Sequence, residues 1–145
     1  MRPFILSLIL MLGLMPLGIA APRDSVNIRV FVSFSMPKAL LKETLAESAR
    51  LHIPAFLNGL HKNSMAKTAS KIFELSRDVP NLNLNIDPTA FERYGIHQVP
   101  ALVVERQGRF DVIYGNLSLS EGLNRIVNRG ETKLTIEEIK EGHSG

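Results

Sequence analysis

Few residues of this sequence combine a reactive side chain with a spacing that could support catalysis. Ser35 follows an apolar run and precedes Pro37, so it stands where a helix should begin. A serine nucleophile needs a neighbouring base, and the chain has no G-x-S-x-G turn to present one. His97, three residues before Pro100, is the one histidine expected to approach Ser35. Cap and turn roles for Ser33 and Ser35 explain these residues with fewer assumptions, so we expect no catalytic residue.

The histidines give no metal site. No two of them lie at i, i+2 or i, i+4, and no pair of carboxylates flanks one, so the spacings of zinc ligands are missing. We therefore expect neither a metal nor a cofactor. The four are His52, His61, His97 and His143.

A loose group of cations lies in and just before the second predicted helix. Lys62, Lys67, Lys71 and Arg77 are not interleaved with aromatic residues. Proteins that hold single strands combine such charge with aromatic stacking platforms. A solvated helix face is the simpler interpretation, and we expect no direct contact with nucleic acid.

The composition excludes whole classes of chemistry. The chain has 145 residues, 45% of them apolar and 21% charged, with a net charge of +3 and no cysteine. This length suits one globular domain. Without thiols the protein cannot form disulfides, thiolate metal sites or a cysteine nucleophile.

The first 20 residues are typical of a secretory signal. Arg2 supplies a positive start, and an apolar run covers Phe4–Leu14. Pro16 prevents the run from extending further, and Gly18 and Ala20 provide the small residues before a cleavage site. The run is shorter than the roughly 20 residues that span a bilayer. We expect cleavage after Ala20, a periplasmic location and no membrane span in the mature form.

The remaining sequence alternates strands and helices in the order β-α-β-α-β-α-β-β-α. Asp87-Pro88 predicts one helix start, Ser118-x-x-Glu121 another, and Gln107-Gly108 a two-residue hairpin loop. Ser35 is expected to cap the first helix, with Pro37 in its first turn, and Asn63 or Ser64 is expected to cap the second. Met65, Ala69, Ile72 and Phe73 share one face of the second helix. The predicted strands are 26–34, 53–57, 82–86, 100–105 and 109–114.

This order predicts an α/β fold, a three-layer sandwich with a mixed sheet, helices on both faces and an antiparallel C-terminal hairpin. Either 53–57 or 82–86 could lie beside the first strand, and the shorter connection favours 53–57. The domain is expected to cover residues 21–130. Residues 131–145 are charged and are expected to form a flexible tail, although Thr135-x-x-Glu138 could cap one more helical turn.

The segment 82–127 resembles the C-terminal half of a thioredoxin-like fold, through Tyr94-Gly95-Ile96 and Val99-Pro100-Ala101. The resemblance implies a cis bond between Val99 and Pro100. Thioredoxins carry Cys-x-x-Cys at the first strand-to-helix junction, where a helix N-terminus lowers the thiol pKa. The matching residues here are Ser35-Met36-Pro37-Lys38, so dithiol chemistry is not implied.

A narrower likeness rests on Phe31-Val32-Ser33-Phe34-Ser35-Met36-Pro37, reinforced by Ile86-Asp87-Pro88. These residues are similar to the TrbC family of F-type conjugative pilus-assembly proteins, over about 26–129. The resemblance implies a periplasmic component of a type IV secretion system that works beside TraW-type proteins and acts on no small molecule.

We hypothesise that the former redox groove has become a protein-docking groove. Its residues are Phe34, Ser35, Met36, Pro37, Lys38, Val99 and Pro100. Backbone groups of Val99 could pair with an extended peptide, and Phe34 and Met36, if exposed, would add apolar contacts. The leading hypothesis is a non-catalytic pilus-assembly factor. The alternatives are a periplasmic chaperone or peptide-holding module unrelated to conjugation, and an enzyme that uses Ser35.

Overall fold

The computed structural model describes residues 25–141, which contain the predicted alternation of strands and helices. The predicted signal segment, with its cleavage after Ala20, lies outside these residues. Within them, no helix is both long and apolar enough to span a bilayer. The strands are β1 (Val26–Val32), β2 (Ala55–Leu57), β3 (Leu84–Ile86), β4 (Ala101–Arg106) and β5 (Arg109–Tyr114).

These strands form one mixed sheet in the order β3-β2-β1-β4-β5. β1 runs parallel to β2, with Val30 beside Ala55, and β2 runs parallel to β3. β4 is antiparallel to β1, with Phe31 beside Ala101, and β5 returns along β4. The strand beside β1 is therefore β2, as the shorter connection predicts. Gln107 and Gly108 have φ angles of 50° and 76°, which match the predicted tight hairpin turn.

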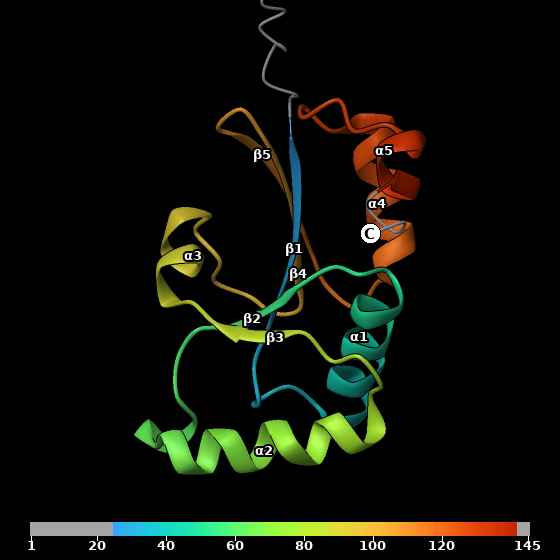
Figure 1. Cartoon of the computed structure of the whole chain (residues 1–145). Helices are drawn as coiled ribbons and strands as arrows, with labels where there is room; N and C mark the ends of the chain where they lie inside the picture. Colours follow the sequence, from blue (N-terminus) through green and yellow to red (C-terminus); the bar gives the residue numbers. More distant parts are fainter. Residues whose placement is uncertain (1–24, 142–145) are drawn as a thin grey trace, which may run out of the picture.

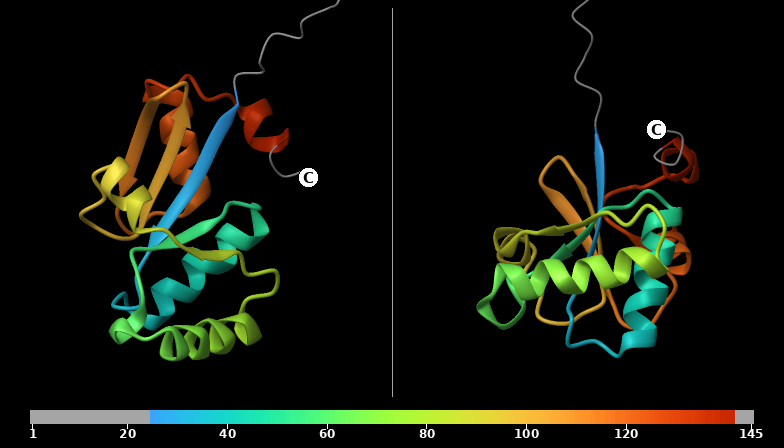
Figure 2. Two further views of the ribbon diagram at one scale, coloured as in Figure 1. Left: turned by 60° about the vertical axis from the view of Figure 1, so that its left-hand side comes forward. Right: turned by 60° about the horizontal axis from the view of Figure 1, so that its bottom comes forward.

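Helices cover both faces of the sheet (Figures 1 and 2). α3 (Pro88–Arg93) lies on one face, and α1 (Lys38–Arg50), α4 (Leu119–Arg129) and α5 (Ile136–Glu141) lie on the other. A short 3-10 turn, η1 (His61–Asn63), leads into α2 (Met65–Asp78). α2 crosses one end of the molecule beside the start of α1 (Figure 1).

Alternation along β1 builds a core on each side of the sheet. Val30, Phe31 and Val32 are all fully buried, but successive side chains of a strand point to opposite faces. Val30 and Val32 join the cluster under α1 and α4. Phe31 joins the cluster under α3, where its ring meets Phe91 edge-on at 4.9 Å between centroids. Two cores thus hold the central strand rigidly.

Local capping signals fix the starts of three helices. The Asp87 carboxylate accepts a hydrogen bond from the Ala90 N–H (3.1 Å), with Pro88 at the first helical position. The Ser64 hydroxyl accepts from the Lys67 N–H (3.2 Å), and the Ser118 hydroxyl accepts from the Glu121 N–H (3.2 Å). All three starts agree with the sequence prediction.

Residues 131–141 differ from the expected flexible tail. Thr132 and Leu134 are buried, and α5 follows a cap in which the Glu138 N–H donates to the Thr135 hydroxyl. The Asp111 carboxylate anchors the segment, since it accepts from the N–H groups of Glu131 and Thr132, both at 2.9 Å. Partial burial raises the pKa of Asp111, but these bonds and one from the Thr132 hydroxyl outweigh it and hold the pKa below its ordinary value. The alternative of one more capped turn is the one observed.

Candidate functional site

The loop between β1 and α1 is a tight turn stabilised by its own side chains. The Met36 N–H donates to the Ser33 carbonyl (3.2 Å), and the Ser35 N–H donates to the Ser33 hydroxyl (3.1 Å). The hydroxyls of Ser33 and Ser35 lie 2.7 Å apart and share a hydrogen bond. Serine hydroxyls compete in this way for nearby backbone groups. The loop therefore has a defined shape before any partner arrives.

The expectation that Ser35 caps α1 is wrong. Pro37 occupies the N-cap position, α1 begins at Lys38, and no side chain accepts from the first N–H groups of the helix. The cause is Ser33, whose hydroxyl engages both the N–H and the hydroxyl of Ser35. The start of α1 is thus an uncapped positive helix end with a lysine in its first turn.

The two apolar residues of the loop are not equally available. Met36 is 8% exposed and belongs to the core under α1, so the exposure on which its apolar contact depended is not present. Its sulfur lies 3.4 Å from the Ser33 N–H, which draws the side chain back under the turn. Phe34 is half-buried and presents its ring to His61, edge-on at 5.5 Å.

Val99 and Pro100 lie beside this loop, as the docking hypothesis requires. The antiparallel register ends with Phe31 beside Ala101, so the residues that follow Phe31 and those that precede Ala101 leave the sheet at the same end. The Val99–Pro100 bond is cis. Val99 is half-buried, whereas Pro100 is buried and its carbonyl accepts from the Gly115 N–H (3.1 Å).

His97 does not pair with Ser35 in the described part of the chain. Its Nδ1 lies 3.1 Å from the Gly95 carbonyl and 3.3 Å from the Tyr114 hydroxyl, and its ring packs on Tyr114. The hydrogen bonds of Ser35 go to Ser33 instead. The geometry gives the proposed nucleophile no adjacent base.

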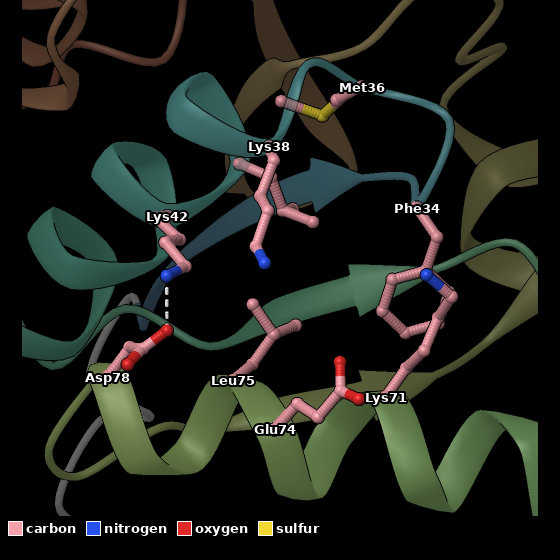
Figure 3. Close-up of a pocket in the computed structure, with 9 residues that line it drawn as sticks. Phe34, Met36, Lys38, Lys42, Lys71, Glu74, Leu75 and Asp78 are labelled. Atoms are coloured by element: carbon pink, nitrogen blue, oxygen red, sulfur yellow. Dashed lines mark ion pairs between the residues drawn. The ribbon is translucent and has the colours of Figure 1, made fainter.

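A hollow opens on the other side of the loop, between the start of α1 and α2 (Figure 3). Its volume is about 140 Å³. Three of the predicted groove residues, Phe34, Met36 and Lys38, line it, while Val99 and Pro100 do not. The hollow therefore extends the site toward α2. The α1 and α2 residues that complete its lining are Leu41, Lys42, Lys71, Glu74, Leu75 and Asp78.

The surroundings of the hollow are electropositive. Lys42 forms an ion pair with Asp78, and its hydrogen bond and charge lower the pKa of that carboxyl. The Lys71 ammonium lies 5.5 Å from the centroid of the Phe34 ring, within cation–π range. Loss of contact with water, and then the charges of Lys71, Lys62 and Lys67, lower the pKa of His61. An anionic group approaching this end of the molecule meets favourable potential.

Sequence reasoning missed the part that α2 plays. The predicted apolar face places Met65 and Phe73 together, but these side chains are 63% and 60% exposed. Lys71 was assigned to a solvated face, yet it stacks on Phe34 and lines the hollow. A signal was present, because Lys71, Glu74, Leu75 and Asp78 follow the i, i+3, i+4, i+7 spacing of a single helix face.

No group of three His, Asp or Glu side chains within residues 25–141 is placed to hold a metal ion. The site consists of an ordered loop, an uncapped helix start, and a hollow lined by both apolar and charged side chains.

The fold is thioredoxin-like, and the sequence contains no cysteine. The chain is similar to the structure of MTB dsbF in its mixed oxidized and reduced forms, with a TM-score of 0.51 and 16% identity over 72% of this chain and 81% of that one. It is equally similar to an exposed lipoprotein thioredoxin from Streptococcus pneumoniae strain TIGR4, with a TM-score of 0.51 and 15% identity over 73% and 86% of the two chains. At such identities the likeness concerns the fold.

The chain belongs to the family of type-F conjugative transfer system pilin assembly proteins, whose model matches residues 30–126. It is also 38% identical, over 112 residues, to the periplasmic protein TrbC of Escherichia coli strain K12. That match includes 77% of this chain and 53% of the relative, so the chain spans about half of the relative's length.

Proposed function

We propose that this protein is a non-catalytic assembly factor of an F-type conjugative pilus system, which acts in the periplasm by holding other proteins of the transfer apparatus. The observation that supports it best is the site at the start of α1. Ser35-Met36-Pro37-Lys38 stand where thioredoxins carry their cysteines, and the chain has no thiol with which to exchange disulfides. Ser35 is engaged by Ser33, and Met36 points into the core.

What remains at this position is a surface suited to binding. The loop is ordered, the start of α1 is uncapped, and the adjacent hollow is lined by four apolar and five charged side chains. Membership of the pilin assembly family favours conjugative partners over a chaperone or peptide-holding module unrelated to conjugation. TraW-type periplasmic proteins are the partners we propose. The predicted signal segment, residues 1–20, would direct the chain to the same compartment.

Capture from conjugating cells tests this function. The full chain, tagged at its C-terminus, is expressed in donors that lack the native gene, and co-purified proteins are identified by mass spectrometry. We expect conjugative transfer proteins, TraW-type among them, and restored DNA transfer. Recovery of no transfer protein from cells in which transfer is restored would contradict the proposal.

A matched variant separates binding from catalysis. Ser35→Ala removes the hydroxyl that any enzyme mechanism at this site would need, and should support wild-type transfer frequency. If Ser35→Ala captured the same partners but lost transfer, the protein would act as an enzyme and the non-catalytic function would be wrong.

A further inference from the structure

The hollow between α1 and α2 has the size of one side chain. Its volume is about 140 Å³, and an apolar cavity of about 150 Å³ accommodates a benzene molecule. The apolar part of its lining includes Met36, Leu41 and Leu75, which belong to the main core and are each less than 9% exposed, so each presents only a small area to the hollow. A leucine-sized group that entered would leave water for an already formed surface.

Charged side chains close both ends of this hollow (Figure 3). At one end Lys42 pairs with Asp78, which bridges α1 and α2. At the other end Lys71 lies over the Phe34 ring. An extended chain could not run lengthwise through the hollow without displacing these groups. The shape therefore favours an occupant that ends there.

Lys38 supplies a positive charge between the two closed ends. Figure 3 shows its side chain extending from the start of α1 toward α2. Lys38 forms no ion pair within residues 25–141. Three lysines line the hollow against two carboxylates, and one of these, Asp78, is already paired with Lys42. An incoming carboxylate would compete for Lys38 and Lys71 with Glu74, and at Lys38 also with the charge of Asp78.

We propose that this hollow binds the C-terminal residue of a partner polypeptide, with its apolar side chain inside and its α-carboxylate at Lys38 and Lys71. In a terminal residue, carboxylate and side chain leave the same Cα, so both can reach one pocket. In an extended internal segment, neighbouring side chains point to opposite sides, and an acidic neighbour would face away from the lysines. This inference rests on the proposed function, since it names the chemistry of the partner at the same site.

Peptide binding to the full mature chain tests the inference. The probe is the acetylated hexapeptide Gly-Ser-Gly-Ser-Gly-Leu with a free C-terminal carboxylate, followed by methyl NMR of Met36, Leu41 and Leu75. We expect saturable shifts of these methyl signals. The same peptide with a C-terminal amide should bind about fivefold more weakly, which is the effect of losing one exposed ion pair.

Charge variants of the protein locate the carboxylate. Lys38→Gln should weaken the free-acid peptide about fivefold and leave the amide unchanged, whereas Glu74→Gln should tighten the free acid. Lys67→Gln, on the same helix but outside the hollow, is the matched control and should change neither.

Three outcomes would overturn the inference. The first is equal binding of acid and amide, and the second is an effect of Lys67→Gln as large as that of Lys38→Gln. The third is tighter binding of an amidated peptide with an internal Leu-Asp pair, which would assign the hollow to an acidic internal segment. Any of these, combined with normal capture of transfer proteins in cells, would leave the proposed function intact. Peptide binding without capture would contradict that function alone.

Discussion

α1 and α4 lie on the same face of the sheet, yet they begin in opposite ways. At the start of α4, the Ser118 hydroxyl accepts from the Glu121 N–H, and the Glu47 carboxylate accepts from the N–H groups of Leu119 (2.7 Å) and Ser120 (3.0 Å). At the start of α1, Pro37 provides no side-chain acceptor, and the first turn has no acidic residue.

α1 takes part in both helix starts. Glu47 belongs to α1, so α1 stabilises the start of its neighbour while its own start stays open. Free N–H groups at a helix start are ordinarily satisfied by side chains or water, and a negative charge there is stabilising. The uncapped start of α1 gives up stability that the start of α4 has, which is consistent with the binding function that we propose for this site.

The largest expected effect on the free energy of unfolding comes from removing the Glu47 acceptor at the start of α4. Glu47→Ala would leave the N–H groups of Leu119 and Ser120 without an acceptor in a partly buried position. Because hydrogen bonds to charged groups contribute more than neutral ones, we expect the free energy of unfolding to fall by about 2–3 kcal/mol. Urea denaturation measures it. Glu43→Ala, at an exposed position one turn earlier in α1, is the control and should lie within about 0.5 kcal/mol of wild type.

The Ser118 cap should contribute less to the free energy of unfolding than the hydrogen bonds of Glu47. Ser118→Ala removes one acceptor of the Glu121 N–H, and such N-cap substitutions cost about 1 kcal/mol. Ser118→Asp keeps an acceptor and should remain near wild type in the same denaturation experiment. Equal losses in both variants would mean that the side chain acts through packing and not as a cap.

Adding an N-cap side chain at the start of α1 tests whether its uncapped state is needed for function. The backbone of Pro37 (φ −51°, ψ 133°) already suits an N-cap residue. Pro37→Asp should be more stable than Pro37→Ala by about 1 kcal/mol, since only aspartate supplies an acceptor. Because both variants lack the proline, the effect of its loss cancels when their free energies of unfolding are compared. Conjugative transfer by Pro37→Asp should nevertheless fall below that of Pro37→Ala; equal transfer would show that the open helix start is not used.

The smallest effect is expected at Ser35. Its hydroxyl contacts Ser33 at the surface and caps nothing, so Ser35→Ala should change the free energy of unfolding by less than about 0.5 kcal/mol. Together with the loss expected for Ser118→Ala, this result would show that Ser118 caps a helix and that Ser35 does not. A loss of 1 kcal/mol or more would show that the Ser33–Ser35 bond maintains the start of α1.

Features that depend on neighbouring residues could be predicted from the sequence. Asp87-Pro88, Gln107-Gly108 and Ser118-x-x-Glu121 act within a few residues, and each forms the expected cap or turn. Ser35 could not be predicted in this way. Both Ser33 and Ser35 offer a hydroxyl acceptor near the start of α1, and only the folded loop shows that Ser33 accepts from the Ser35 N–H.

Features that depend on tertiary placement could not be predicted. Glu47 meets Ser120 across 73 residues, and no local pattern marks such a pair. The hollow exists because α2 lies across the start of α1, so Leu75 and Lys71 acquire their roles only in the folded chain. Leu134 is one of few apolar residues after Gly130, but its burial, the packing of Ile139, the Asp111 anchor and the Arg106–Glu138 ion pair together hold residues 131–141 in place.

The course of β1 also decides how the molecule can be held in an experiment. Its seven residues span about 20 Å, from Val26 near the β4–β5 hairpin to Val32 next to the loop at α1 (Figure 1). A linker to a sensor surface, or a fluorophore, introduced immediately before Ser25 would therefore sit at the far end of the sheet. Immobilised that way, the protein would point its lysine-bordered end outward, free to meet whatever is passed over it.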